Sequence, residues 1–312
     1  TITAAQLDNA GYTQDPSETI NYAEAHDNET LFDIIQYKAP LDTTMADRVR
    51  MQTLGNAFVL LAQGVPFLHE GQDMLRSKSF DRNSYDSGDW FNALDFTYQH
   101  NNWGKGLPLA QDNQGSWDYM KARLANPALA PASEDIVRAN AQTRELLKIR
   151  KSSKLFRLET AEQIKSVVSF YNNGANQVPG VVAMNLKDTV ANIDPNVEDI
   201  LVVFNANTSS KTLAINELKG WEFALHTVQA ASADDRLKQA SVDNAKAEFT
   251  VPARTVAIFV TNKKLTDTST PVTPDPKPTK SKAGGSIVFA QLMDAWLCLM
   301  LVVIGVWRTR SS

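Results

Sequence analysis

The fold is decided by the stretch Ile20-Asn21-Tyr22-Ala23-Glu24-Ala25-His26-Asp27-Asn28-Glu29-Thr30-Leu31. It begins as a short apolar run and changes abruptly into adjacent titratable groups at His26 and Asp27. Strands of a (β/α)₈ barrel carry their chemistry at this carboxyl end. We therefore expect residues 20–27 to form a strand that ends in a functional site. Taken alone, the dipeptide is equally consistent with a helix N-cap or a buried polar pair.

A second unit of the same kind follows. Thr44-Met45-Ala46-Asp47 opens a helix as a variant of the capping box. Its apolar positions recur at helical spacing and stop at Gly64. Val65–Leu68 predicts the next strand, which also ends in polar residues. This alternation indicates a βαβ arrangement with a parallel sheet, so the predicted class is α/β, with the C-terminal part of a (β/α)₈ barrel over residues 1–158.

The end of this first region contains a long loop and a helix. Arg76–Asn126 is rich in Ser, Asp, Asn and Gly, which predicts a long irregular loop that is functional rather than disordered. Trp90, Trp103 and Trp117 in this loop suit the stacking of sugar rings. The apolar positions of Glu134–Lys151 predict an amphipathic helix.

After residue 158 the pattern changes to short β-branched runs separated by turn residues. The runs are Val167–Tyr171, Val181–Asn185, Ile200–Phe204, Thr212–Ile215 and Val256–Val260. They predict an all-β sandwich domain over residues 159–262.

The remaining residues predict a linker and a membrane segment. Residues 263–283 form a Pro/Thr/Lys-rich stretch, typical of an extended linker. Residues 284–312 contain Gly284-Gly285-Ser286, an apolar run over Ile287–Trp307 and a basic end. A run of about 20 apolar residues is long enough to cross a bilayer as a helix. Asp294 opposes insertion by roughly 2.5–3.5 kcal/mol, and we still expect a transmembrane helix.

Composition excludes some partners and indicates a missing segment. The 31 basic and 35 acidic residues give a net charge of -4, which argues against nucleic acid as a partner. The single cysteine, Cys298, cannot form an internal disulfide. The chain begins at Thr1 without an initiator Met or a signal peptide, which predicts that the N-terminal part of a longer protein precedes it.

Two stretches resemble one enzyme family. Residues 21–33 resemble the fourth signature region of the α-amylase superfamily in its pullulanase-type form, and residues 76–92 resemble the loop after the eighth strand of type I pullulanases. The resemblance covers about residues 1–262. It implies the C-terminal part of a retaining glycoside hydrolase that cleaves α-1,6-glucosidic branch links in pullulan, starch or glycogen-type α-glucans.

The resemblance also implies roles for individual residues. Asp27 would be the catalytic residue that stabilises the transition state, and the substrate-binding residues would be His26, Asn28, Arg82, Asn83, Tyr85, Asp89 and Trp90. The nucleophilic Asp and the proton-donating Glu of the family lie on earlier strands, and no stretch here matches their motifs. Retaining hydrolysis needs both, about 5–5.5 Å apart, so we expect this chain alone to be inactive.

No cofactor and no metal ligand is predicted. Calcium is possible at Asp81, Asp86 and Asp89, but no EF-hand spacing supports it. The tail resembles a Gly-Gly C-terminal sorting signal of Gram-negative bacteria, or else a plain membrane anchor. It implies membrane contact, a rhomboid-type sorting protease as a partner, and an exported protein at the cell surface or released from it. The alternative functions are another α-amylase-superfamily enzyme, such as an isoamylase or an α-1,4-acting one, and a non-catalytic surface glucan-binding protein.

Overall fold

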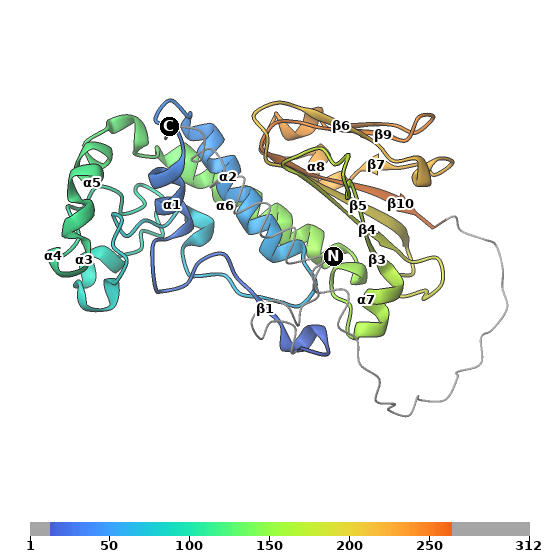
Figure 1. Cartoon of the computed structure of the whole chain (residues 1–312), viewed down its shortest axis with the longest axis horizontal. Coiled ribbons are helices and arrows are strands. Elements are labelled where there is room, and N and C mark those ends of the chain that lie inside the picture. The colour runs from blue at the N-terminus through green and yellow to red at the C-terminus, as the bar shows by residue number, and fades with distance from the viewer. Residues whose placement is uncertain (1–12, 264–312) are drawn as a thin grey trace.

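The structure is a computed structural model that describes residues 13–263. Its α-helices are α1 (Leu31–Lys38), α2 (Met45–Leu61), α3 (Asp89–Asn92), α4 (Ala110–Asn113), α5 (Trp117–Leu124), α6 (Ser133–Ser152), α7 (Ala161–Val167) and α8 (Thr227–Ala230). Its strands are β1 (Ile20–Asn21), β2 (Val65–Pro66), β3 (Val168–Tyr171), β4 (Val181–Lys187), β5 (Val197–Asn205), β6 (Lys211–Ala214), β7 (Ala224–Leu225), β8 (Ser241–Asp243), β9 (Glu248–Val251) and β10 (Thr255–Asn262). In Figure 1, α2 and α6 cross the middle of the molecule, with the short helices of the long loop on one side and the two larger sheets on the other.

The predicted βαβ rhythm is confirmed at its centre. β1 and β2 pair in parallel, with Ile20 opposite Val65, and α2 connects the two strands. Helix α2 begins where the capping pattern predicts, because Oγ1 of Thr44 accepts a hydrogen bond from the backbone N–H of Asp47 at 3.2 Å. The additional helix α1 lies between β1 and α2 and was not predicted.

The predicted strand over residues 20–27 is wrong beyond Asn21. From Tyr22 to Thr30 the chain forms a loop without ladder hydrogen bonds. A side chain closes this loop, since Glu24 accepts a hydrogen bond from the backbone N–H of Leu31. The prediction of Val65–Leu68 as a strand is likewise too long by two residues.

The predicted sandwich consists of two antiparallel sheets that enclose a common core. The larger sheet has the order β3-β4-β5-β10-β7 and the smaller one β6-β9-β8. Leu201 and Val203 of β5 face the smaller sheet, where they join a core that includes Phe249. Each predicted run contains a strand, although the first strand starts at Val168 because α7 precedes it.

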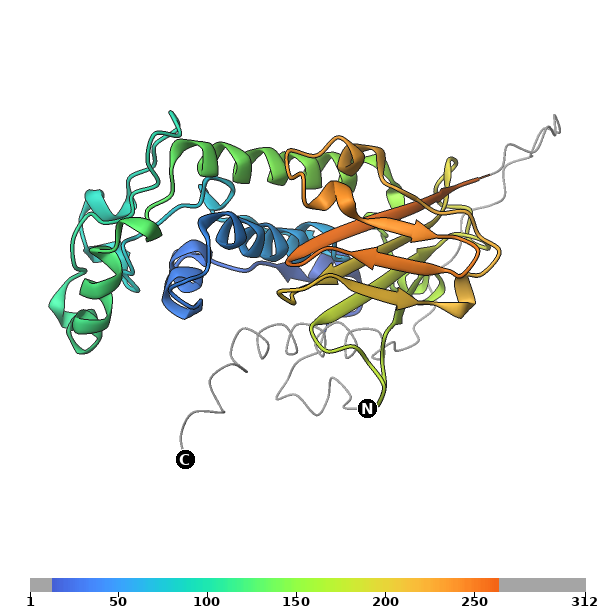
Figure 2. The same cartoon turned by 90° about the horizontal axis from the view of Figure 1, so that it is seen from above.

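Helices α2 and α6 cover the outer face of the larger sheet, and Figure 2 shows both helices running toward it. The alternate residues of β5, including Val202 and Phe204, belong to the core that α2 and α6 share with the sheet. The ring of Phe58 from α2 stacks on Phe204, with ring centroids 4.0 Å apart. Strand β5 is therefore buried on both faces, which explains its continuous apolar sequence.

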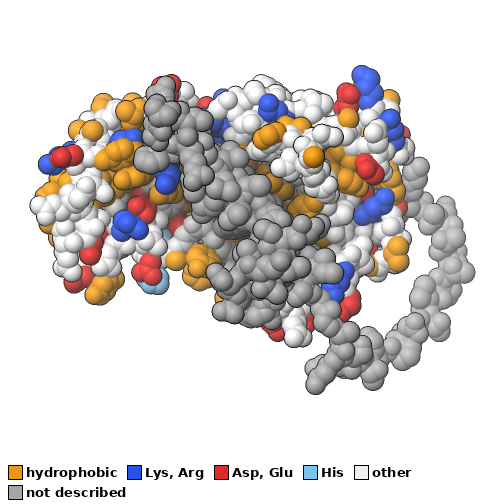
Figure 3. All heavy atoms as spheres, in the orientation of Figure 1, with side chains coloured by type: hydrophobic (Ala, Val, Ile, Leu, Met, Phe, Trp, Pro, Cys, Tyr) orange, Lys and Arg blue, Asp and Glu red, His pale blue; other side chains and the backbone are white. Residues whose placement is uncertain are grey.

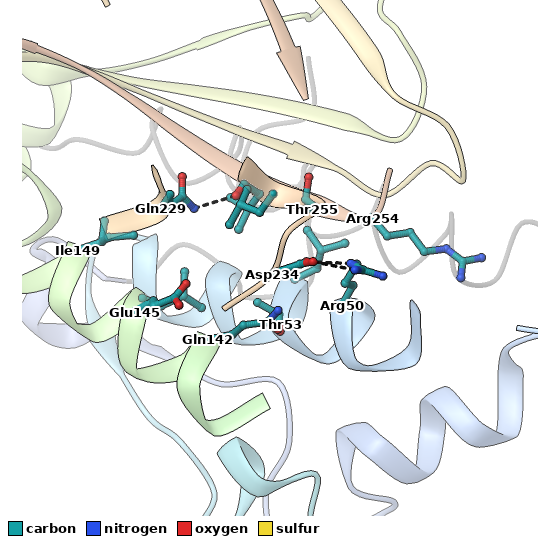
Figure 4. Close-up of a pocket in the computed structure, with 13 residues that line it drawn as sticks. Arg50, Thr53, Gln142, Glu145, Ile149, Gln229, Asp234, Arg254 and Thr255 are labelled. Atoms are coloured by element: carbon teal, nitrogen blue, oxygen red, sulfur yellow. Dashed lines mark hydrogen bonds and ion pairs between the residues drawn. The ribbon is translucent and has the colours of Figure 1, made fainter. Parts of the chain in front are cut away.

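Ion pairs connect α2 to the segments that precede β8 and follow β9. Figure 4 shows the pair between Arg50 and Asp234. The guanidinium of Arg50 donates to both carboxylate oxygens of Asp234, at 2.8 and 2.7 Å. Asp47, one turn earlier on α2, receives Arg236 at 2.6 Å and Arg254 at 3.3 Å. Arg50 also lies 3.2 Å from Asp47, so the Asp47 carboxylate is shared among three arginines.

One arginine joins three further segments. The guanidinium of Arg150 on α6 donates to the backbone carbonyls of Leu60, Ala62, Gly64 and Phe156. Two of these carbonyls lie at the end of α2, where no helical partner remains for them. The same side chain therefore caps α2 and holds the approach to β2.

None of the helices within residues 13–263 has the length and apolar content needed to cross a membrane. The predicted transmembrane helix at Ile287–Trp307 and almost all of the predicted linker lie outside the described residues. On the face shown in Figure 3, acidic and basic side chains are interspersed among apolar ones.

Candidate active site

The loop that carries His26 and Asp27 is closed at its base by Glu24. This side chain is 5% exposed, and its Oε1 lies 3.0 Å from Nδ1 of His69, beyond the end of β2. The other ring nitrogen of His69 lies 3.0 Å from Nη1 of Arg76. Because an arginine only donates, Nε2 of His69 accepts, and Nδ1 carries the proton that is donated to Glu24. The ends of both strands are thus joined through the side chain of His69.

At the tip of the loop, His26 and Asp27 point into solvent. Their side chains are 80% and 74% exposed, and Nε2 of His26 lies 3.5 Å from Oδ1 of Asp27. They are not a buried pair. They are not a helix N-cap either, because Thr30 caps α1 by accepting a hydrogen bond from Asp33 N at 3.1 Å. Both alternative interpretations of the dipeptide are therefore excluded.

The loop at residues 76–92 attaches directly to this tip. The backbone N–H of Asn28 donates to the carbonyl of Arg82 at 2.9 Å, and Nη2 of Arg82 donates to Oδ1 of Asn28 at 3.2 Å. Nε of Arg82 also lies 3.5 Å from Glu29. The fold thus brings together four predicted site residues: His26, Asp27, Asn28 and Arg82.

The other predicted site residues lie elsewhere on the loop. Nδ2 of Asn83 donates to Asp112 in α4 at 3.0 Å, and Asp89 is the first residue of α3. Tyr85 and Trp90 are 83% and 65% exposed, which leaves both rings free to stack on a ligand. Within residues 13–263, no hydrogen bond or ion pair connects Tyr85, Asp89 or Trp90 to His26 or Asp27.

The long loop is more ordered than the sequence predicts. It contains α3, α4 and α5, and its tryptophans are not equivalent. Trp103 packs edge-on against Phe32 and Phe80 in a core, so it serves folding rather than sugar stacking. The indole N–H of Trp117 is occupied by the carbonyl of Pro108 at 2.9 Å.

A buried carboxylate beneath the site was missed by sequence reasoning. Asp33 in the first turn of α1 is fully buried and accepts hydrogen bonds from Ser77 Oγ, Lys78 N and Phe80 N. Burial raises the pKa of Asp33 to about 6, although these donors oppose the shift. Asp33 lies three residues after Thr30, as in a capping box. This local pattern gives no sign of the hydrogen bonds that Asp33 accepts from the distant loop.

A family comparison identifies the chain. Residues 98–262 match the sequence model of the family described as alpha-1,6-glucosidases, pullulanase-type, C-terminal. The chain belongs to the pullulanase-type alpha-1,6-glucosidases. The matched residues run from within the long loop, before α4, to the last strand of the sandwich.

Other members of the pullulanase-type family cover more of the chain. Pullulanase 1, chloroplastic, of Arabidopsis thaliana is 46% identical over 255 residues, which cover 80% of this chain and 26% of that protein. The pullulanase of Klebsiella pneumoniae is 37% identical over 252 residues, which cover 80% of this chain and 23% of that protein. The chain therefore spans about a quarter of the length of these relatives.

Solved pullulanase structures agree with the fold. PulA from Klebsiella oxytoca superposes with a TM-score of 0.76 at 34% identity, over 83% of this chain and 25% of that one. The maltotriose complex of PulA from Klebsiella pneumoniae gives the same TM-score at 36% identity, over 83% of this chain and 28% of that one.

The aspartates considered for calcium differ in their surroundings. Asp81 is buried, and its Oδ1 accepts from the backbone N–H of Asn83 at 3.0 Å, whereas Asp86 and Asp89 are exposed. Within residues 13–263, no three His, Cys, Asp or Glu side chains are arranged to hold a metal ion.

Proposed function

We propose that this chain supplies the C-terminal part of the catalytic (β/α)₈ barrel of a retaining debranching enzyme. The enzyme would hydrolyse α-1,6-glucosidic links in pullulan, starch or glycogen-type α-glucans. The observation that carries the proposal is the position of Asp27. It is an exposed carboxylate on a loop after a parallel strand, and that loop is braced at its base by Glu24 and at its side by Arg82.

The exposed apolar face of the two-stranded sheet supports the proposal of a barrel. Ile20 and Val65 are opposite one another in register, and Tyr22 and Phe67 follow two residues later on each chain. Ile20 and Val65 are paired on one face of the sheet, and just beyond the strands the rings of Tyr22 and Phe67 meet edge-on, with centroids 6.3 Å apart. Each is at least 44% exposed, and a parallel sheet normally has both faces covered. This apolar face is suited to form the interior of a barrel with further strands.

The substrate is inferred from chemistry and from a relative. Cleavage of a glycosidic bond passes through a positively charged, oxocarbenium-like transition state that a fixed carboxylate stabilises. Asp27 would interact with the distorted sugar and its hydroxyls, and His26 would donate to a neighbouring hydroxyl. A pullulanase of Klebsiella pneumoniae is solved with maltotriose, which supports an α-glucan oligosaccharide as the ligand of this chain. Tyr85 and Trp90 would bind the adjoining sugar rings.

The test uses the longer protein that carries this sequence. We expect purified residues 1–312 to release no reducing sugar from pullulan and the longer protein to release maltotriose. In the longer protein, Asp27→Asn should lower kcat by about 1,000-fold or more, because it removes transition-state charge stabilisation. Asp118→Asn, which changes a fully exposed carboxylate on α5, is the matched control. Turnover by residues 1–312 alone, or an Asp27→Asn enzyme with normal kcat, would refute the proposal.

We further propose that the protein is exported and reaches the cell surface through residues 284–312. The support is the sequence order of Gly284-Gly285, an apolar run and a basic end. Fractionation of cells that express the longer protein should place it at the surface or in the medium. Replacing both glycines with valine should block release while leaving the membrane-bound form. Cytosolic recovery of the unaltered protein would contradict export.

A further inference from the structure

Lys78 is an unusual residue at the centre of the candidate site. Its side chain is fully buried, and its Nζ donates to the backbone carbonyl of His26 at 2.7 Å. Within residues 13–263, this ammonium forms no ion pair, and burial lowers the pKa of Lys78 despite the nearby carboxylates of Asp33 and Asp81. A buried cation that lacks a paired anion is costly, and an apolar side chain of similar volume is often at least as stable in such a place.

The backbone around Lys78 is conformationally strained. Leu75, Ser79 and Phe80 all have positive φ, at 58°, 47° and 69°, although none is a glycine. Each such residue stores on the order of 1–3 kcal/mol, and such strain is concentrated at functional sites. The hydrogen bonds from Ser77, Lys78 and Phe80 to Asp33 hold this turn in place. Helix α1 thus anchors the turn that directs Lys78 inward.

The contact to His26 is the third support of the exposed tip. Glu24 closes the base of the loop, and Arg82 pairs with Asn28 on its far side. Without Lys78, the peptide that joins His26 to Asp27 has no side-chain support among the described contacts. Its rotation would redirect the Asp27 carboxylate and loosen the neighbouring hydrogen bond from the Asn28 N–H to the Arg82 carbonyl.

We propose that Lys78 is a positioning residue for Asp27: its ammonium fixes the His26 carbonyl and thereby the direction of the Asp27 carboxylate. The role rests on the proposed function, in which Asp27 meets the transition state. A displacement of about 1 Å in a catalytic group can lower the rate about 100-fold. The side chain never contacts the sugar in this arrangement, so its loss should lower kcat rather than raise KM.

The first arm of the test uses residues 1–312 alone, without any activity. Lys78→Met keeps the length of the apolar stem and removes the charge and the donor. We expect amide hydrogen exchange at Asn28, whose N–H bonds to the carbonyl of Arg82, to accelerate about tenfold or more, with no fall in melting temperature. Lys105→Met is the matched control, because Lys105 is exposed and its backbone N–H donates to Ser79 in the same loop assembly. Unchanged exchange at Asn28, or loss of the melting transition in Lys78→Met, would overturn the proposal.

The second arm uses the longer protein and separates the two proposals. Lys78→Met should lower kcat on pullulan by about 10- to 100-fold with KM within about threefold, whereas Lys105→Met should keep both values. An unchanged kcat overturns the role of Lys78 even where Asp27→Asn abolishes turnover. Absence of turnover in the unaltered longer protein overturns the proposed function instead, and the exchange measurement then decides whether Lys78 fixes the tip.

Discussion

Glu24 and His69 join the ends of two parallel strands, with Oε1 of Glu24 3.0 Å from Nδ1 of His69. The two strands themselves contribute only two residues each to their ladder. Side-chain contacts beyond the strands therefore determine where the site loop begins and where the 76–92 loop departs.

Replacing Glu24 should destabilise the protein measurably. Glu24→Ala leaves the backbone N–H of Leu31 and the ring N–H of His69 without their acceptor. We expect the free energy of unfolding to fall by about 2–4 kcal/mol, and by less for Glu24→Gln, which keeps one acceptor. Urea unfolding measures both changes. Glu70→Ala, at an exposed neighbouring carboxylate, should stay within about 0.5 kcal/mol, and a Glu24→Ala protein that matches it would contradict the bracing role.

Asp33 should give the protein a specific pH dependence. Its folded-state pKa of about 6 lies above the unfolded value of 3.8, so folding favours the neutral form. Its contribution is complete below about pH 4 and is lost as the pH rises through about 6, a change of up to about 3 kcal/mol. The difference in unfolding free energy between the natural protein and Asp33→Asn should therefore shift against the natural protein over this window. A difference that is independent of pH would refute this assignment, and Asp118→Asn, at a fully exposed carboxylate, serves as the reference variant.

The ion pair between Arg50 and Asp234 should stabilise the contact between α2 and the sandwich. Asp234→Ala leaves a largely buried guanidinium without its bidentate partner, so we expect a loss of about 2–4 kcal/mol. The adjacent Asp235 is the control, because its side chain is 93% exposed and, among the described residues, pairs only with Lys238. Its change to Ala should leave stability nearly unchanged. Equal effects of the two substitutions in thermal unfolding would contradict the anchoring role of Asp234.

The stacked rings of Phe58 and Phe204 should contribute most to the stability of the contact between α2 and the sandwich. Phe204→Ala should lower the free energy of unfolding by about 3–5 kcal/mol, since it removes a buried ring and leaves a cavity against α2. Val190→Ala, at a side chain that is 90% exposed, should leave stability within about 0.5 kcal/mol. Chemical denaturation of both variants tests this, and a loss below about 1 kcal/mol for Phe204→Ala would show that the interface does not depend on the pair.

Local patterns in the sequence predicted much of the fold. Thr44 and Asp47 predicted the start of α2, because a helix cap is formed by residues three apart. The apolar run at Ile200–Phe204 predicted β5, because both faces of that strand are buried. The extent of the first strand was not predictable, since its end is set by Glu24 and the distant His69.

The site was predictable only in its exposed parts. His26, Asp27 and Arg82 belong to recognisable stretches, and the fold places them together. No pattern in the sequence indicated a role for Lys78 or Asp33. Only the tertiary structure shows that both are buried and that each bonds to residues more than 40 positions away.

The hydrogen bonds of Arg150 have a consequence for local unfolding of the protein. One guanidinium bonds to carbonyls at the end of α2, before β2 and in the segment that leads into the sandwich. None of these segments can detach without breaking charge-assisted hydrogen bonds to the others, so they form one cooperative unit. The slowest-exchanging amides of α2, α6 and β5 should therefore share a single opening free energy, whereas the exposed tip at His26 fluctuates independently of it.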